Sequence, residues 1–395
     1  MDNNNNVALS SEVIKEDFNF SSRHSDNLPA ILDALNISLA VTSYQSQQLI
    51  LIRTQEGRLD TNLNTYPRPM GIYSDGQRIT LGTLNQVIDF KRSDSILHKI
   101  RDGLLDDSSQ LPSKLQERDS DSVQQYLARR AEQLDEIKNA DALFVQRASL
   151  NTGMINIHDI AWGNEGLWVV NSTFSCLATL DPEYNFIARW IPPFITELQP
   201  EDRCHLNGMA MLDGEPRYVT TFNQANSQDS WQESPQLDGT LIDVKSGETL
   251  LTGLIMPHSP RCYAGQVYFC NSGTGEIQIY NPKNRQTRTL CKLPGFTRGI
   301  TFVGELMLVC TSKLRASERA ATIPLQTELP PGNSICGIWL LDPETGTQLA
   351  NLQFTGDVEQ IYDIAVIPHC RVPELARQED ALTRHLFEFR QEIRL

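Results

Sequence analysis

The feature of this sequence that most restricts its fold is a segment that occurs twice. Residues 158–171 begin with His-Asp-Ile-Ala-Trp and end with Val-Val-Asn, and residues 258–271 begin with His-Ser-Pro-Arg-Cys and end with Phe-Cys-Asn. In each copy the asparagine follows the histidine by 13 residues and is itself followed by serine. Apolar residues flank a glycine-containing turn in both copies, which predicts two antiparallel strands joined by a tight turn.

Four weaker copies of this hairpin begin near Pro69, Asn207, Thr297 and Tyr362. The steps from 158 to 207, from 207 to 258 and from 258 to 297 are 49, 51 and 39 residues long, close to the roughly 40–50 residues of one four-stranded propeller blade. Second hairpins with turns of Asp, Asn, Pro or Gly follow several of them, for example at 277–287. The sequence therefore predicts an all-β fold, a six-bladed β-propeller.

The two ends of the repeat predict how the ring closes. The last inner strand, 363–367, has no outer strands after it, whereas 38–65 contains strands with no inner strand before them. Pairing these segments closes the ring and removes exposed sheet edges. The propeller then spans 31–373, preceded by a polar segment at 1–30 that we expect to be disordered or loosely docked.

Two further segments have the periodicity of helices. Asp94-Ser95 and Asp121-Ser122 can each cap a run of apolar residues spaced three and four apart, so we expect a helical insert at about 93–141. The tail, 374–395, is expected to form a C-terminal helix. The residues expected to dock this helix on the ring are Leu382, Leu386, Phe387 and Ile393.

Composition limits the kinds of partner. The formal charge is −15 and the pI is near 4.9, so we expect neither nucleic acid nor an anionic membrane as a partner. No run approaches the roughly 18 apolar residues of a membrane span, and the N-terminus lacks the pattern of a secretory signal, so we expect a cytoplasmic protein. The eight cysteines include no Cys-x-x-Cys pair and are expected to be reduced and mostly buried.

The predicted ring also places a candidate site. In an antiparallel blade the first strand starts at the face where the second strand ends, so the six inner hairpins bring polar residues to one mouth of the axis, a common place for a ligand depression. The candidate catalytic residues, which would act by general acid–base chemistry, are His158, Asp159, His258 and Asp363. The candidate substrate-binding residues are Arg261, Asn271, Arg298, Lys313 and Glu359.

Two interpretations are open for the histidines. His158, Asn207 and His258 can hold one divalent metal ion, because imidazole and polar oxygen groups are ordinary ligands of zinc, iron or manganese. Alternatively, the histidines donate hydrogen bonds to backbone carbonyls between the blades, as buried polar groups must find partners.

Two interpretations are also open for the cations. In a chain of net charge −15, Arg261, Arg298 and Lys313 would make a local positive region for a small polar or anionic molecule. Alternatively, they form an internal ring of ion pairs, whose carboxylates are Asp159, Glu359 and Asp363.

These residues support two classes of function. The first is an enzyme of hydrolase or isomerase type that acts on a small molecule at the mouth, by metal-assisted hydrolysis or by proton transfer. The sequence has no Gly-x-Ser-x-Gly elbow, so a serine nucleophile is not predicted. The second is a non-catalytic ligand-binding or scaffold propeller, with 93–141 or the C-terminal helix meeting a protein partner.

Several runs of the chain resemble a family of bacterial proteins classified as a conserved domain of unknown function. These runs are 158–162, 205–208, 256–261, 271–276, 293–299, 336–339 and 362–366. The resemblance extends over about 140–370 and more loosely over 36–92, and it implies no particular activity. This chain has Met154 and Asn156 where the family usually has acidic residues, and Cys262 where it usually has an aromatic residue.

A more distant resemblance links the Asn-Gly-Met-Ala run at 207–210 to six-bladed propellers of the gluconolactonase and strictosidine-synthase type. Those lactonases hold a divalent metal at the axis with Asn and acidic ligands. The resemblance implies that Asn207 and Asp363 would be the nearest counterparts here, although a shared fold does not fix a function.

Overall fold

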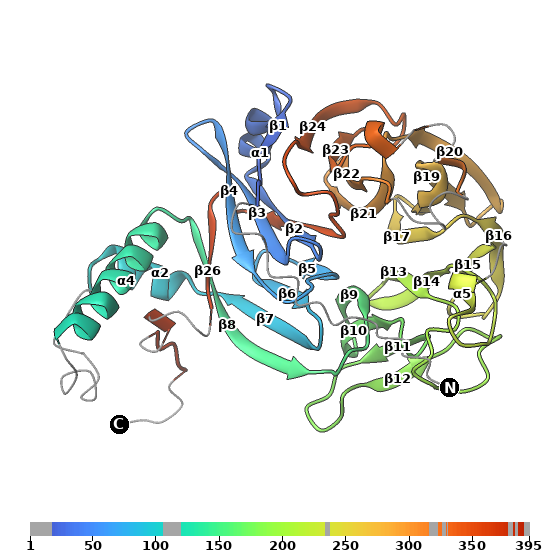
Figure 1. The fold of residues 1–395 in the computed structure, drawn as a ribbon, viewed down its shortest axis with the longest axis horizontal. Coiled ribbons are helices and arrows are strands. Elements are labelled where there is room, and N and C mark those ends of the chain that lie inside the picture. The colour runs from blue at the N-terminus through green and yellow to red at the C-terminus, as the bar shows by residue number, and fades with distance from the viewer. Residues whose placement is uncertain are drawn as a thin grey trace, which may run out of the picture.

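The computed structural model describes residues 18–105, 120–233, 238–315, 323–325, 329, 331–377, 382–383 and 386–390. Its strands form six sheets arranged round one axis, and the predicted six-bladed β-propeller is confirmed (Figure 1). Each blade begins with a strand that contacts the corresponding strand of the next blade, so these inner strands form a ring. The inner strands are β5 (Ile72–Ser74), β9 (Ile157–Gly163), β13 (Leu206–Leu212), β17 (Pro257–Tyr263), β21 (Phe296–Val303) and β25 (Ile364–Pro368).

The outer strands follow the inner strand in chain order in five blades, whereas those of the sixth come from the beginning of the chain. In the first three blades they are β6 (Arg78–Gly82), β7 (Gln86–Arg92), β8 (Ala142–Asn151), β10 (Gly166–Asn171), β11 (Cys176–Thr179), β12 (Ile187–Trp190), β14 (Glu215–Thr221), β15 (Gly239–Asp243) and β16 (Thr249–Leu254). In the last three they are β18 (Gln266–Asn271), β19 (Glu276–Asn281), β20 (Gln286–Lys292), β22 (Leu306–Ser312), β23 (Gly337–Leu341), β24 (Gln348–Phe354), β2 (Ile37–Ser43), β3 (Gln48–Gln55) and β4 (Arg58–Thr65).

The ring closes as the sequence predicted. β25 comes near the end of the chain and pairs with β2 from its beginning, with Ala365 opposite Ala40. The blade cores lie between neighbouring sheets, where alternate strand residues face each other. Leu51 of β3 and Ile79 of β6, for example, are both fully buried in one cluster.

Two short strands extend the outer edges of two blades. β1 (Ser22–His24) pairs with β24, and β26 (Pro373–Ala376) runs parallel to β8. Of the segment 1–30, residues 1–17 lie outside the described residues. The remainder carries β1 and the start of α1 (Leu28–Leu35), whose Leu32 is buried against the ring.

The helical insert is confirmed. It contains α2 (Asp94–Arg101) and α4 (Ser120–Lys138), which lie together at the outer edge of the blade that contains β8 (Figure 1). Residues 106–119 of the insert lie outside the described residues. Within the described part of the chain, no helix is long and apolar enough to cross a membrane.

The expected C-terminal helix is corrected at its start, because the segment after 372 forms β26 instead. The outer edge of β8 offers unpaired backbone groups, and a parallel strand satisfies them. Residues 386–390 have no regular structure, and 378–381, 384–385 and 391–395 lie outside the described residues. Leu382 and Leu386 are nevertheless buried, against the insert, whereas Phe387 is exposed.

Candidate functional site

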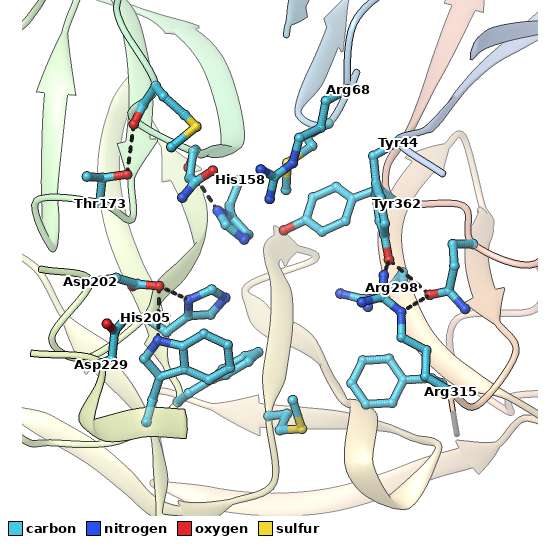
Figure 2. A pocket seen from close by; sticks show the side chains of 18 of the residues that line it. Tyr44, Arg68, His158, Thr173, Asp202, His205, Asp229, Arg298, Arg315 and Tyr362 are labelled. Carbon is cyan, nitrogen blue, oxygen red and sulfur yellow. Dashed lines mark hydrogen bonds and ion pairs between the residues drawn. The ribbon is translucent and has the colours of Figure 1, made fainter. Parts of the chain in front are cut away.

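A cavity of about 690 Å³ lies where the inner strands begin, and we call it the mouth cavity. Residues from every blade line it, among them Met70, His158, His205, Met256, Phe296 and Tyr362. Figure 2 shows Asp202, His205 and Asp229 on one side of the cavity and Arg298 and Arg315 on the other, with His158, Arg68 and Tyr362 between them.

Four neighbouring inner strands have a β-bulge near their first residues, which sets the direction of the side chains there. The pairing of the first strand with the second shifts register at His158-Asp159, at Asn207, at Ser259-Pro260 and at Arg298-Gly299. A bulge adds a residue on one strand and turns its side chain away from the regular alternation. Adjacent residues such as His158 and Asp159 therefore reach different parts of the axis.

A second repeated feature lies shortly before four inner strands, β5, β9, β13 and β17. Arg68, Asn156, His205 and Met256 all have a left-handed backbone, with φ of 48°, 49°, 46° and 51°. All four side chains line the mouth cavity. Non-glycine residues in this region cost of the order of 1–3 kcal/mol each and collect at functional sites.

His158 is held by its Nδ1 atom. This nitrogen lies 2.8 Å from the carbonyl oxygen of Asn156 and 2.7 Å from Oγ of Ser172. Ser172 donates its own proton to the carbonyl of Leu206, so Nδ1 carries a proton and Nε2 is a free acceptor. Among the described residues Nε2 has no partner, and the ring lines the cavity.

His258 has the same anchoring but a different partner at Nε2. Its Nδ1 lies 2.9 Å from the carbonyl of Met256 and 2.8 Å from Oγ of Ser272. Its Nε2 accepts a hydrogen bond of 2.6 Å from Nη1 of Arg298. Burial lowers the pKa of both histidines well below the usual value, and the positive charge of Arg298 lowers that of His258 further.

Arg298 therefore has an unusual environment. Its guanidinium carbon lies 4.6 Å from the ring centre of Phe296 and 5.4 Å from that of Tyr362. In the part of the chain that the structure describes, no carboxylate lies within 4.0 Å of it, and its Nε atom is buried without a partner. Burial lowers the pKa of this guanidinium from its usual value.

Tyr362 occupies the middle of the site. Its ring centre lies 5.5 Å from that of His158 and 6.2 Å from that of His258. Its hydroxyl points into the cavity towards Arg68 and His158 (Figure 2). Burial raises the pKa of this hydroxyl well above its usual value, so it stays protonated and can donate a hydrogen bond.

Asp159, Arg261 and Asp363 lie deeper in the axis and form a buried ion cluster. Nη1 of Arg261 donates to Oδ2 of Asp159 at 2.7 Å, and Nη2 lies 3.7 Å from Oδ1 of Asp363. The carboxylates also accept backbone N–H groups, from Met209 and Ile72 respectively. Asp159 and Arg261 line a second cavity, of about 360 Å³, rather than the mouth cavity.

Glycines on the intervening strands make room for this cluster. Asp159 lies on β9, Arg261 on β17 and Asp363 directly before β25, while β13 and β21 carry Gly208 and Gly299 at the axis. A Cβ atom at Gly299 would lie 2.7 Å from Oδ1 of Asp363, and one at Gly208 would lie 2.5 Å from Pro260. The cluster and its glycines thus tie alternate blades together.

The remaining predicted site residues, Lys313, Glu359 and Asn271, each have a partner close by in the fold. Lys313 lines the mouth cavity and pairs with the exposed Glu359 at 3.1 Å. Asn271 lies outside the cavity lining and accepts a hydrogen bond from the backbone N–H of Ile255 at 2.7 Å. Arg261 and Lys313 thus each pair with carboxylates named for the ring of ion pairs, in two separate groups, and no ion pair of Arg298 is found among the described residues.

Of the three expected metal ligands, His258 has partners at both ring nitrogens. Nε2 of His258 already accepts from the Arg298 guanidinium, and a cation would be repelled there. Both Nδ1 atoms point to backbone carbonyls. Asn207 is buried, with neither amide atom hydrogen-bonded in the described structure. The described residues contain no group of three or more His, Cys, Asp or Glu arranged to hold an ion.

Sequence reasoning missed the aromatic side of the cavity. Phe222 follows β14, and Trp231 lies on the short helix α5 (Ser230–Glu233) in a long connection after it. Both rings line the cavity beside His205. Neither lies in the repeated hairpin, so no periodic signal marked them. Arg68 lies one residue before Pro69, the expected start of the first hairpin, so the repeat nearly included it.

The fold and the cavity define the class: a six-bladed β-propeller with a polar and aromatic pocket at one mouth. Within this class, the chain belongs to the family described as "Domain of unknown function (DUF4915)", which matches residues 26–116 and 118–376. A comparison with curated proteins finds no match.

Among solved structures, a chain of the crystal structure titled "Crystal structure of Nidogen/Laminin Complex" is similar. The TM-score is 0.50 at 9% identity, and the alignment covers 84% of this chain and 99% of that chain. At this identity the likeness shows the fold alone.

Proposed function

We propose that the protein binds a small organic anion in the mouth cavity and acts on it by proton transfer to Nε2 of His158. The single observation that carries the proposal is the environment of Arg298. Its positive charge is half-buried against a neutral histidine and two aromatic rings, with no carboxylate within 4.0 Å among the described residues.

Several other arginines of this acidic chain have acidic partners. Arg53 pairs with Asp60 and Glu374, and Arg203 pairs with Glu197 and Glu201. A desolvated charge without a counter-ion costs free energy that a bound anion recovers. The planar guanidinium can hold a carboxylate or phosphate in two parallel hydrogen bonds.

Three further groups of the cavity suit a bound anion. Arg68 adds a second cation and has no ion pair in the described chain, and the Tyr362 hydroxyl is available as a donor. His158 presents a lone pair at Nε2, and its lowered pKa keeps it unprotonated at neutral pH.

In the proposed step, a proton leaves an O–H or C–H group of the ligand and binds to Nε2. The electron pair of the broken bond stays on the ligand, where Arg298 and Arg68 stabilise the added negative charge. Return of the proton to another ligand atom completes an isomerisation without any further reactant. For metal-assisted hydrolysis of the lactonase kind, Nε2 of His258 is not available as a ligand, because it accepts a hydrogen bond from Arg298.

Binding is tested by calorimetry against a panel of small carboxylates and phosphates. We expect at least one to bind, with affinity reduced about 10-fold or more in Arg298→Gln, since a charged hydrogen bond contributes about 1.5–3 kcal/mol. Arg285→Gln is the matched control, because Arg285 is exposed and pairs with Glu248. No binding to the wild type, or equal binding by both variants, would overturn the proposal.

Proton transfer is tested with a bound anion in D₂O. Abstraction and return of a proton incorporates deuterium at a carbon of the ligand, which proton NMR detects. His158→Gln should abolish this exchange and retain binding within a few-fold. Binding without exchange in the wild type would reduce the function to recognition alone.

A further inference from the structure

We propose that the anion recognised at the mouth is aromatic, with its ring packed against Phe222 and Trp231 on the wall opposite Arg298. This inference rests on the proposed function, because the anionic group fixes one end of the ligand. The other end of the cavity then selects the part of the ligand that carries no charge.

The wall consists of three rings in mutual contact, which we call the aromatic wall: His205, Phe222 and Trp231. The ring centres of His205 and Trp231 lie 4.0 Å apart, and those of His205 and Phe222 lie 4.4 Å apart. Phe222 and Trp231 meet edge to face at 5.5 Å. All three rings line the mouth cavity, so a ligand there contacts an aromatic surface.

Hydrogen bonds hold this wall in place without a ligand. Oδ2 of Asp202 accepts from Nε1 of Trp231 at 2.9 Å and lies 2.8 Å from Nδ1 of His205. Ser230, the first residue of α5, donates to the carbonyl of Arg203 at 2.6 Å. A rigid aromatic wall lowers the entropy lost on binding, because few side chains remain to be ordered.

The aromatic wall and the cations face one continuous space. His205 of this wall lies opposite Arg298 and Arg315, and Tyr362 lies between the two sides (Figure 2). The volume of about 690 Å³ is large enough for a ring with an anionic substituent. One molecule can therefore place its charge at Arg298 and its ring on Trp231.

The ring chemistry of the wall favours an aromatic ligand over an aliphatic one. Aromatic rings pair edge to face or offset-stacked, which adds to the burial of apolar area. We expect this preference to be about 3- to 10-fold in affinity, converted from the usual size of such pairs.

The experiment uses acids that carry the same anionic group on a phenyl or a cyclohexyl ring: benzoate and cyclohexanecarboxylate, phenylacetate and cyclohexylacetate, and phenyl and cyclohexyl phosphate. Titration calorimetry on the full chain should show the aryl member of at least one pair binding 3-fold or more tightly. Trp231→Leu, which retains apolar bulk, should remove that preference. Trp190→Leu, on the outer strand β12, is the control and should keep it.

The outcomes separate this inference from the proposed function. Equal binding within every pair, or binding of aliphatic acids alone, would overturn the aromatic class and leave anion recognition intact. An unchanged preference in Trp231→Leu would also overturn it. Binding of phenylacetamide as tightly as phenylacetate would overturn the proposed function, because the charge would then contribute nothing.

Discussion

Arg298 donates a 2.6 Å hydrogen bond to Nε2 of His258, while the equivalent Nε2 atom of His158 faces the mouth cavity. The two histidines occur at matching positions of β9 and β17, and a serine and a backbone carbonyl anchor each in the same way. In both copies of the repeat the histidine therefore carries its proton on Nδ1. At His258 it positions an arginine, and at His158 it leaves an acceptor for a ligand.

Replacement of Arg298 tests whether this charge serves binding rather than stability. Arg298→Leu should leave the free energy of unfolding unchanged or raise it by about 1 kcal/mol, because a desolvated charge without a counter-ion is removed. Arg261→Leu should instead lower it by about 3–5 kcal/mol, because Asp159 and Asp363 would remain buried without their cation. Urea denaturation measures both, and an equal loss in the two variants would contradict this distinction.

The two histidines should make the protein less stable in mild acid. Their folded-state pKa values are lowered by burial, so below about pH 6.5 the unfolded chain binds protons that the folded chain excludes. Stability should therefore fall as the pH drops below 6.5, by up to about 1.4 kcal/mol per pH unit for each histidine.

The measurement is urea denaturation from pH 7.5 to 5 for the wild type and for His158→Gln/His258→Gln. The difference between the two free energies isolates the histidines from other titrating groups. Parallel curves would show that the imidazoles are not held neutral in the folded protein.

The hairpin repeat explains why the fold could be predicted from the sequence. Its period gave six inner strands, and the unmatched segments at 38–65 and 363–367 gave the closure through β2 and β25. The tail was less predictable, because the apolar spacing of Leu382 and Leu386 suits a docked helix as well as an irregular docked segment. The edge of β8, which recruits β26, exists in the folded sheet alone.

The candidate site was predictable in part, for the same reason. The repeat places Arg298 against His258 and puts His158 and Arg298 in the lining of one cavity, which does not include His258. It could not separate residues that face the mouth cavity from those that face the axis, because bulges in β9 and β17 send neighbours such as His158 and Asp159 to different depths. Trp231 came from a connection of irregular sequence, whose path depends on tertiary contacts such as that between Ser230 and Arg203.

Asp363 should produce a pH dependence opposite in sign to that of the histidines. Burial, together with the nearby charge of Asp159, raises the pKa of Asp363 to about 7 although Arg261 opposes the shift. The folded chain then binds a proton that the unfolded chain releases above about pH 4. This stabilisation is complete below pH 4 and is lost as the pH rises through 7.

Asp363→Asn replaces the carboxyl group with a neutral amide of the same shape. It should therefore remove the contribution of Asp363 to the pH dependence of stability. Between pH 4 and 7 the stability of the variant should rise relative to that of the wild type, by up to about 1.4 kcal/mol per pH unit. Asp159→Asn should instead cost about 3–5 kcal/mol at neutral pH, because Arg261 loses its two-point partner. A constant difference between Asp363→Asn and wild type would contradict the raised pKa.

The tail should be required for the order of the helical insert. Leu386 is 5% exposed and packs in one cluster with Ile96 and Ile100 of α2 and Leu134 of α4, so the apolar face of the insert is covered by the chain itself. Leu386→Asp would bury a carboxylate among these side chains, which costs several kcal/mol, and the tail should detach instead. We expect faster hydrogen exchange in α2 and α4, with exchange in the blades unchanged.

The neighbouring Phe387 is 67% exposed, so Phe387→Asp makes the same chemical change as a matched control. Equal exchange in the two variants would show that the tail does not hold the insert, and would return 93–141 to consideration as a docking element for another protein.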